Sequence, residues 1–441
     1  MKTKRFNLAY GTRTVEFSLP WPNVVQPEKP LDRPLPVDIE ATLRSGLSHP
    51  RGDPGWTKRI KPGARVCLVC DDYTRPTPSA RILLPLLDAL NRKGIQDADM
   101  CILVAAGFHR EMTAEELSGK YGPEICRRIR IVHHKAEAYD TDLLHLGRTG
   151  MGIPIWVHRE VLEADISIGI GVVEIHPRAG FAGGCKIVSP GVAGKRTIDA
   201  THALPYTCPG VEIGKTEGNP FWQSCVEVAR KAGLDAVINV VLNRRNQVIA
   251  LEVGEPVAAQ QAAIDAFKRV NELRFSTKPD LVIASSYPKD QYFGQAMIAG
   301  YNAARLVRPG GLRIILGACP EGFGDCAYES DYYERSMAAD WSLPQVFVEA
   351  MRGEEDACSR NCCAVHRYLE DLKNSDCIFV SDGLPADADF PNLKVVRSLE
   401  EAIQEGRRRF SDQATVAVID KAGMVLPVVM PGANEILEIP S

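Results

Sequence analysis

The chain has 441 residues, too many for one ordinary hydrophobic core, so we expect two domains. An apolar content of 45%, a charged content of 24% and a net charge of −4 indicate a globular protein without a general attraction to nucleic acid or anionic membranes. No apolar run approaches the roughly 20 residues that span a bilayer, and the N-terminus lacks a signal-peptide core, so we expect a cytoplasmic protein.

Short apolar segments alternate with helical patterns along most of the chain. The first 20 residues alternate polar and apolar side chains like a strand pair. Because the later strands are almost continuously apolar, helices should cover both faces of each sheet. We therefore predict an α/β fold with mostly parallel strands. The expected strands are 64–72, 98–107, 164–173, 236–243, 279–286, 310–318, 376–383 and 415–423, and the clearest helical patterns are 78–94, 256–275 and 392–410.

A hinge around residues 272–280 divides this pattern into two parts. We expect residues 1–275 and 411–441 to form an N-terminal α/β domain, with the final segment pairing as a hairpin and returning to it. Residues 276–410 would form the second α/β domain.

Two motifs follow the expected strands 64–72 and 98–107. Residues 71–78 (DDYTRPTP) lie at a strand's carboxyl end, where ligands bind in α/β proteins, and Arg75 offers a planar fork for anions. The alternative is a plain helix start, capped by Thr77 or Ser79. His109, in the segment GFHR, would lie on the same rim and act as a general base. Alternatively it only precedes the next helix, where Thr113 begins a capping-box pattern.

The segment 174–202 (EIHPRAGFAGGCKIVSPGVAGKRTIDATH) is the strongest candidate for the site. It places His176, Lys186 and His202 around a glycine-rich loop. A lysine between glycines suits a phosphate or a covalent carbonyl partner, and an imidazole suits a metal. The spacing matches neither a Walker loop nor a dinucleotide fingerprint. Residues 218–220 (GNP) fit a nucleotide-pocket wall or a tight turn equally well.

The remaining histidines and the cysteines carry weaker signals. We interpret His133, His134, His158 and His366 as structural. The 13 cysteines, an odd number in a large chain, argue against a disulfide framework. The one cluster is Cys358, Cys362 and Cys363, which lacks the four closely spaced ligands of a zinc or iron–sulfur site.

Taken together, these motifs resemble those of the lactate racemase family, whose members carry a nickel-pincer nucleotide. The matching blocks are DDYTRPTP, GFHR with MTAEEL, IHPRAGFAGGCKIVSPG, THAL, GNP, YPKDQYFGQA and CPEGFG. They extend over nearly the whole chain, and their order and spacing make the resemblance specific. The resemblance implies two α/β domains with an interdomain active-site cleft, the C-terminal one closing over a cofactor bound by the N-terminal one.

The resemblance also implies roles for individual residues. The cofactor would be pyridinium-3-thioamide-5-thiocarboxylic acid mononucleotide with nickel. Hydride would leave the α-carbon of a 2-hydroxy acid for this cofactor and return to the opposite face, inverting the centre. The implied roles are Lys186 for the covalent thioamide link, Asp72, Thr74, Gly183 and Gly184 beside the cofactor, His202 as nickel ligand, His109 and His176 as acid/base pair, and Arg75 and Gln295 for the substrate.

The chain departs from the lactate-racemising pattern on one expected helix. Gly294 stands where that pattern has a tyrosine, and Ile298 stands where it has a lysine. The first change enlarges the pocket and the second removes a charge from it. A larger, more apolar or sugar-like 2-hydroxy acid is therefore expected in place of lactate. The expected partners are this acid and the enzymes that make and insert the cofactor. A homodimer is possible, and we expect the chain to bind neither nucleic acid nor a membrane.

Two other classes of function fit the residues. His109, His176 and His202 would also suit a hydrolase or lyase with a histidine-bound metal, although no close ligand pair such as H-E-x-x-H supports it. A non-catalytic binding homologue is the third hypothesis, and the retained acid/base groups count against it.

Overall fold

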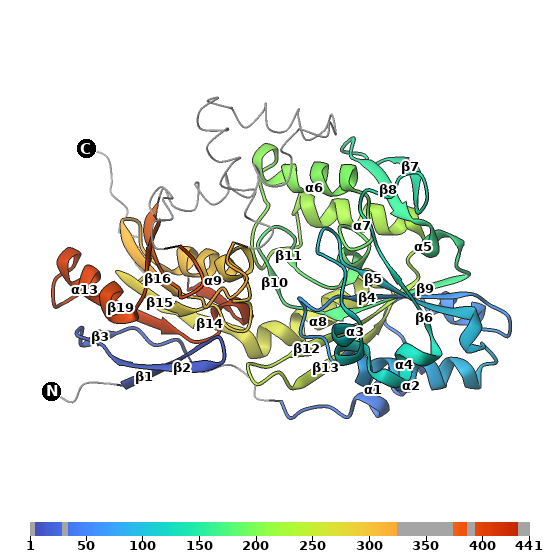
Figure 1. The fold of residues 1–441 in the computed structure, drawn as a ribbon, viewed down its shortest axis with the longest axis horizontal. Helices are drawn as coiled ribbons and strands as arrows, with labels where there is room; N and C mark the ends of the chain where they lie inside the picture. Colours follow the sequence, from blue (N-terminus) through green and yellow to red (C-terminus); the bar gives the residue numbers. More distant parts are fainter. Residues whose placement is uncertain (1–4, 29–33, 324–373, 386–392, 431–441) are drawn as a thin grey trace. The chain divides into compact units, whose positions relative to one another are not determined.

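The structure is a computed structural model that describes residues 5–28, 34–323, 374–385 and 393–430. Contacts between α-carbons divide the chain into two compact units. One unit, here the site unit, contains the described residues 34–270. The other, here the second unit, contains the described residues 5–28, 271–323, 374–385 and 393–430. Both are α/β structures built on largely parallel sheets (Figure 1).

The site unit is built on a six-stranded sheet with the order β13-β12-β9-β4-β5-β6. All neighbouring pairs are parallel except β12 and the edge strand β13. The strands are β4 (Val66–Asp71), β5 (Met100–Ala105), β6 (Arg130–His133), β9 (Ile166–Val172), β12 (Ala236–Leu242) and β13 (Val248–Gly254). The helices are α1 (Ile39–Ser48), α2 (Ser79–Arg92), α3 (Ala114–Tyr121), α4 (Pro123–Arg128), α5 (Arg159–Glu163), α6 (Lys195–Thr207), α7 (Pro220–Ala232) and α8 (Pro256–Asn271).

Alternate residues of the central strand β4 enter two different apolar cores. Leu68 and Cys70 pack in the core that contains the apolar face of α2. Cys67 and Val69 pack in the core that contains α7. Since side chains of a strand alternate between the two faces of the sheet, both faces are covered. This explains why the strand is apolar without a polar alternate position.

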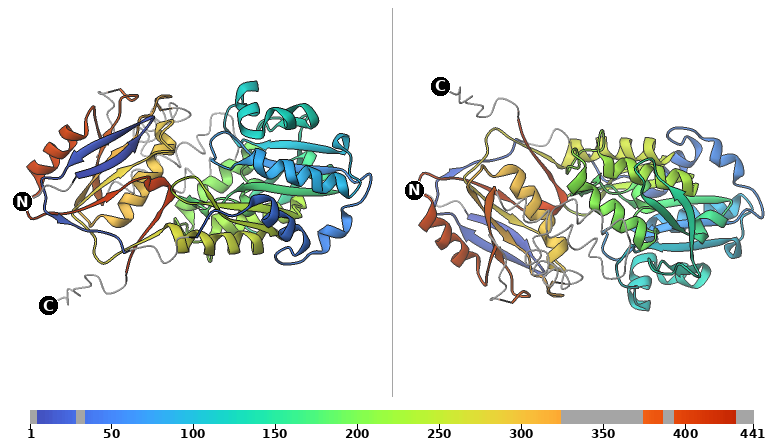
Figure 2. Two further views of the ribbon diagram at one scale, coloured as in Figure 1. Left: turned by 90° about the horizontal axis from the view of Figure 1, so that it is seen from below. Right: turned by 90° about the horizontal axis from the view of Figure 1, so that it is seen from above.

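The second unit is built on a sheet with the order β18-β17-β16-β15-β19-β3, parallel throughout. Residues from both ends of the chain meet in it, and Figure 2 shows the N-terminal hairpin β1–β2 beside C-terminal segments. The strands are β3 (Asn23–Val24), β15 (Leu281–Ser285), β16 (Gly311–Leu316), β17 (Ser375–Val380), β18 (Leu393–Val396) and β19 (Thr415–Ile419). The hairpin is β1 (Arg5–Tyr10) with β2 (Arg13–Ser18), a parallel pair joins β14 (Glu272–Phe275) to β20 (Leu426–Val429), and the helices are α9 (Phe293–Leu306) and α13 (Leu399–Arg409).

The division of the chain differs from the expected domains at both termini. The main boundary, at residues 270 and 271, lies near the expected one. Residues 5–28 and the described C-terminal segment, however, cluster with the second unit. The reason is strand pairing: β19 lies between β15 and β3, and β20 pairs with β14. The expected C-terminal hairpin that returns to the first domain is therefore wrong.

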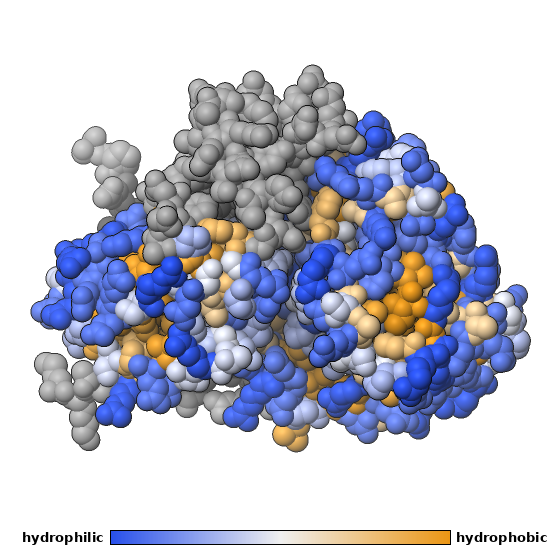
Figure 3. Space-filling model, viewed as in Figure 1, coloured by the Kyte–Doolittle hydropathy of each residue, from blue (hydrophilic) through white to orange (hydrophobic). Residues whose placement is uncertain are grey.

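Two helical patterns also contain strands. Residues 272–275 form β14 instead of ending the preceding helix, and residues 393–396 form β18 before α13. No helix among the described residues is long and apolar enough to cross a membrane. Hydrophilic side chains cover most of the face drawn in Figure 3, with apolar residues in smaller patches.

Candidate active site

Several of the candidate residues occupy loops that follow three neighbouring strands of the site unit. β9, β4 and β5 lie side by side and run parallel, so their carboxyl ends share one edge of the sheet. This edge is where α/β proteins bind ligands. Asp72, Thr74 and Arg75 follow β4, His109 follows β5, and Glu174 and His176 follow β9.

Asp72 is the partner of His109. Its Oδ2 atom lies 2.6 Å from Nδ1 of His109, and the hydroxyl of Thr74 donates to its Oδ1 atom at 2.5 Å. Burial alone would raise the pKa of Asp72, but the charge and hydrogen bond of His109, followed by Arg75 and Thr74, lower it to about 2. Because an ionised carboxylate only accepts hydrogen bonds, the neutral ring of His109 carries its proton at Nδ1 and its lone pair at Nε2. That nitrogen is suited to accept a proton from a substrate.

Arg75 is held by groups from two of these loops. Its Nε atom lies 3.5 Å from Oε1 of Glu174, and both side chains are largely buried. Its Nη1 atom donates to the hydroxyl of Thr74 at 3.1 Å. Lys120 of α3 donates from Nζ to the backbone oxygen of Arg75 at 2.6 Å. These contacts hold the guanidinium in one position, as recognition of a carboxylate requires.

Helix α3 anchors the same loop through Asp71. Nζ of Lys120 lies 2.9 Å from Oδ1 of Asp71, and both side chains are less than a tenth exposed. The phenol of Tyr121 donates to the backbone oxygen of Asp71 at 2.9 Å. The hydroxyl of Thr77 also binds the Asp71 carboxylate. Thr77 is thus not the cap of α2; the N-cap residue is Pro78, and no side chain caps the helix there.

Lys186 lies in the short 3-10 turn η3 (Gly184–Ile187). Burial, followed by the charge of Arg75, lowers its pKa to about 7, against the opposing influence of Cys225 and Glu174. A lysine with this pKa is partly a neutral amine at physiological pH. A neutral amine is the form that attacks a carbonyl or thiocarbonyl carbon.

The two glycines before Lys186 are required by packing within the protein. Both have positive φ angles, 75° at Gly183 and 54° at Gly184. A Cβ atom on Gly184 would lie 2.3 Å from Cδ of Gln260, and one on Gly183 would lie 2.7 Å from a methyl group of Val173. Gln260 in turn donates to the backbone oxygen of Gly183 at 3.1 Å. The loop backbone therefore packs directly against α8, and this contact fixes the position of the Lys186 backbone.

His202 lies in the middle of α6, not at a helix start. Its Nδ1 atom is 2.7 Å from the backbone oxygen of Ile198, which only accepts, so Nδ1 is protonated and Nε2 carries the lone pair. This is how metal-binding histidines are usually oriented. Its ring packs edge-on against Phe221, with ring centroids 5.2 Å apart.

His176 shares the Phe221 contact, with ring centroids 6.1 Å apart. Burial lowers its pKa, and the charges of Lys186, Arg75, Arg178 and His202 lower it further. The structure therefore brings His176, Lys186, His202 and Arg75 into one electrostatic neighbourhood, and Arg75 joins it to the Asp72–His109 pair. Gln295 belongs to α9 of the second unit, where its Nε2 atom donates to the hydroxyl of Tyr292 at 3.3 Å.

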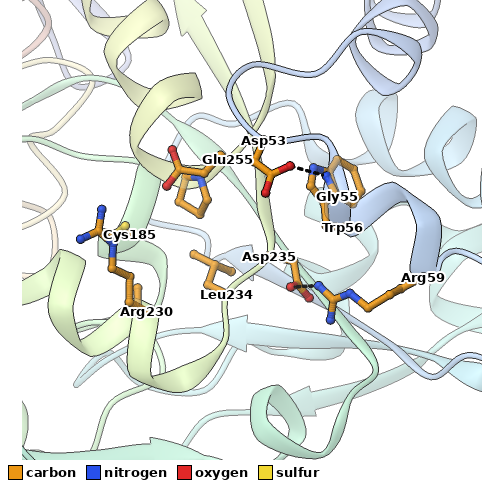
Figure 4. A pocket seen from close by; sticks show the side chains of 11 residues that line it. Asp53, Gly55, Trp56, Arg59, Cys185, Arg230, Leu234, Asp235 and Glu255 are labelled. Carbon is orange, nitrogen blue, oxygen red and sulfur yellow. Dashed lines mark hydrogen bonds and ion pairs between the residues drawn. The ribbon is translucent and has the colours of Figure 1, made fainter.

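A separate cavity of about 340 Å³ lies in the site unit, and none of the candidate residues lines it. Cys185 and Leu234 are among its walls, and the ion pair of Arg59 with Asp235 lies at its margin (Figure 4).

Several residues that support the site escaped the sequence analysis. Glu174 pairs with Arg75, a contact that no local sequence pattern predicts. Lys120 and Phe221 contact the site from helices distant in sequence. Asn219, noted only as part of the GNP segment, is fully buried and caps α7. The cysteine cluster at 358–363 and His366 lie outside the described residues.

An α/β protein with acid/base groups, an arginine and a buried lysine at the strand ends has the features of an enzyme. A family model for the lactate racemase N-terminal domain matches residues 10–214. Lactate racemase of Lactiplantibacillus plantarum is 30% identical over 394 residues, covering 88% of this chain and 91% of that protein. Lactate racemase of Thermoanaerobacterium thermosaccharolyticum is 30% identical over 329 residues, covering 72% of this chain and 75% of that protein.

Solved structures have the same fold. The lactate racemase apoprotein from Thermoanaerobacterium thermosaccharolyticum superposes with a TM-score of 0.79 at 22% identity, covering 96% of this chain and all of that one. A Thermotoga maritima protein superposes with a TM-score of 0.65 at 20% identity, covering 90% of this chain and all of that one. The chain belongs to the lactate racemase family, and it is an enzyme of the isomerase class.

Proposed function

We propose that this chain inverts the α-carbon of a 2-hydroxy acid by hydride transfer to and from a nickel-pincer nucleotide, and that its substrate is not lactate itself. The names of its relatives support the racemase reaction. The observation that carries the proposal is the joint environment of Lys186 and His202. A lysine with a pKa of about 7 and an imidazole with its Nδ1 proton on a backbone carbonyl lie near the same histidine, His176.

The residues present fit such a cofactor. A neutral amine at Lys186 suits a covalent thioamide bond, and the Nε2 lone pair of His202 suits a nickel ion. Asp72, Thr74 and the backbone of Gly183 and Gly184 would lie beside the nucleotide. When bound, the cofactor would supply a metal-activated pyridinium carbon that accepts and returns hydride.

The chain's own groups would bind and deprotonate the substrate. Arg75, fixed by Glu174 and Thr74, would hold the substrate carboxylate by paired hydrogen bonds. His109, oriented by Asp72, would accept the hydroxyl proton at Nε2. His176 would serve the opposite enantiomer, whose hydroxyl points the other way. Because a single hydride donor reaches only one face at a time, the planar keto acid would turn about its clamped carboxylate between the two transfers. An acid/base group on each side would then meet its oxygen in either orientation.

The proposed substrate preference is based on the resemblance to the family pattern along α9. Gly294 and Ile298 occupy positions where the lactate-racemising pattern has a tyrosine and a lysine, and Ile298 is 6% exposed. Without the lysine charge and the phenol, the site would have more room and less polarity for the substrate's side chain. Gln295, between them, would contact the substrate. A 2-hydroxy acid larger than lactate, apolar or with its own hydroxyls, fits this description.

The alternative of a hydrolase or lyase with a metal held by three histidines gains no support. Among the residues that the structure describes, no three histidine, cysteine or acidic side chains form a group that could hold a metal. Nδ1 of His176 also accepts from two backbone amides, so Nε2 of the neutral ring carries a proton and no lone pair for a metal.

The test is to express the chain with and without the enzymes that make and insert the cofactor. Intact and peptide mass spectrometry should find an adduct on Lys186 only in the first case, together with bound nickel. Chiral chromatography of a panel of single-enantiomer 2-hydroxy acids should then show inversion of one class, and little of lactate. Inversion by protein with an unmodified lysine would contradict the proposal, as would zinc alone restoring activity.

A further inference from the structure

The three histidines of the site have their ring protons fixed in different ways. For His109 and His202, Nδ1 faces an acceptor, a carboxylate in one case and a carbonyl in the other. For His176, Nδ1 faces donors: the backbone N–H groups of Arg178 at 3.2 Å and Ala179 at 3.0 Å. An amide N–H cannot accept a hydrogen bond, so Nδ1 of His176 carries the lone pair. Neutral His176 therefore carries its proton at Nε2.

The turn that imposes this form is held from outside. The side chain of Asn219 donates from Nδ2 to the backbone oxygen of Arg178 at 2.8 Å and to that of Lys215 at 2.9 Å. The N–H of Gly214 donates to the oxygen of Gly180 at 3.0 Å. Gly180 has a φ of 76°, and a Cβ atom there would lie 2.0 Å from the oxygen of Lys215. The turn from His176 to Gly180 is thus fastened to the segment 214–219 at Arg178 and at Gly180.

Asn219 is well suited to hold this turn because it is itself immobile. It is 0% exposed, and its Oδ1 atom caps α7 by accepting from the N–H groups of Phe221 and Trp222 at 3.0 and 3.2 Å. All the hydrogen-bonding capacity of one amide side chain is therefore used, with the oxygen on the helix and the nitrogen on the turn. The next residue but one, Phe221, packs against the His176 ring.

We propose that Asn219 is a positioning residue that holds His176 in the Nε2–H form, so that the two histidines of the proposed reaction begin it in opposite forms. His109 presents a lone pair at Nε2 and accepts a proton directly. His176 presents an N–H at Nε2 and donates a hydrogen bond to the substrate oxygen. For His176 to accept a proton at Nε2, the proton already on Nε2 must first pass through solvent to Nδ1, and this requires the turn to release Nδ1. The consequence for catalysis rests on the proposed function, whereas the ring form of His176 does not.

This asymmetry constrains the kinetics in a defined way. Two enantiomers have equal free energy, so a racemase must have the same kcat/KM for both. A difference between the two histidines must therefore appear as equal factors in kcat and KM. The enantiomer whose hydroxyl faces His176 should have the lower kcat and the lower KM, because it is bound by a donor that must change form before reacting.

Nitrogen NMR of the full-length chain, labelled with ¹⁵N in histidine, tests the proposal. Ring nitrogens with and without a proton differ widely in chemical shift, and His176→Gln assigns the signal of interest. We expect His176 protonated at Nε2, and His109 and His202 protonated at Nδ1. A wild-type His176 signal with the proton at Nδ1 would overturn the proposal without any variant.

Asn219→Ser and Asn219→Asp form the matched variants. Both keep an oxygen that caps α7, and both lose the Nδ2 donor to the turn. His176 should shift to an averaged or mixed signal in both, with His109 and His202 unchanged. An unchanged His176 signal in a folded variant would show that Asn219 does not determine the ring form of His176. If one variant does not fold, the other decides.

The outcomes separate the two proposals. In the cofactor-loaded protein, each Asn219 variant should bring the kcat values of the two enantiomers closer together. The ratio of the larger kcat to the smaller should fall to about half of its wild-type value or less. Equal kcat values in the wild type would overturn the kinetic consequence. Absence of any racemase activity would overturn the proposed function and leave the NMR result standing.

Discussion

Nδ1 of His109 lies 2.6 Å from the carboxylate of Asp72, and that carboxylate is 98% buried within a shell of hydrogen-bond donors. The pair fixes the imidazole with its lone pair at Nε2. The same segment that carries Asp72 also carries Arg75, so one loop positions both the proton acceptor and the proposed carboxylate clamp.

Asp72→Asn should lower kcat about 10²-fold or more, because the amide favours the opposite ring form of His109. Steady-state racemisation of the cofactor-loaded variant measures this. Asp88→Asn, an exposed change on α2, is the matched control and should leave kcat unchanged. A variant at position 72 with wild-type kcat would show that the pair does not serve proton transfer.

Arg75→Lys should raise KM about tenfold to a hundredfold with a smaller change in kcat, because a point charge replaces a two-pronged donor. Arg81→Lys, an exposed change on α2, provides the comparison. If KM is unaffected by the change at Arg75, the guanidinium does not bind the carboxylate, and its ion pair with Glu174 is only structural.

Lys186 should react with an acylating reagent with a pH midpoint near 7, as its lowered pKa requires. The neutral amine prevails above the pKa, so the rate should rise through pH 7 and reach a plateau well below the ordinary lysine value of about 10.4. Peptide mass spectrometry of the cofactor-free protein follows this residue, with exposed Lys231 as the internal comparison. Arg75→Gln removes a repelling charge and should move the midpoint upward; a midpoint above 10 in the wild type would contradict the account.

Lys120→Met should destabilise the site unit by about 3–5 kcal/mol, because it leaves the carboxylate of Asp71 buried without its cation. Denaturant unfolding measures the loss. The double variant Lys120→Met with Asp71→Asn removes the charge as well and should recover much of the stability. No recovery would mean that packing, and not the ion pair, dominates at this position.

The buried pair of His134 and His158 should make the protein sensitive to acid. Burial, followed by the neighbouring charge of His158, lowers the pKa of His134 to about 3. The unfolded chain takes up a proton near pH 6.5 and the folded chain does not. Stability should therefore fall by about 1.4 kcal/mol per pH unit between roughly pH 6.5 and 3, and remain unaffected by this group above pH 6.5.

His134→Gln removes this titration and should flatten the pH dependence by that slope, as denaturant midpoints across the range would show. A variant with the same slope as the wild type would assign the acid sensitivity to other groups.

The sequence predicted the sheets better than it predicted what joins them. Continuous apolar runs identified β4, β5, β9 and β15 because burial on both faces leaves a local signature. The pairing of β19 with β15 has no local signature, because the two strands are more than 100 residues apart in sequence. The short strand β18 was hidden by the helical pattern that follows it.

The site shows the same contrast. Arg75 and His109 were placed on one rim because strand ends predict ligand positions. Their partners were not, because a contact such as Lys120 with the Arg75 carbonyl depends on how a helix returns to the sheet. Thr77, expected as a possible cap, instead binds the Asp71 carboxylate, a choice that only the folded loop determines. The capping box from Thr113 to Glu116 was predicted and is confirmed, because it involves neighbours in sequence.

The central claim is inversion by hydride transfer, and the fate of the α-hydrogen tests it most directly. A single enantiomer of an accepted 2-hydroxy acid, carrying deuterium at the α-carbon, is converted by the cofactor-loaded enzyme in ordinary water. The account predicts an inverted product that retains its deuterium, because the hydrogen never becomes a solvent-exchangeable proton. Inversion with loss of deuterium to water would contradict it.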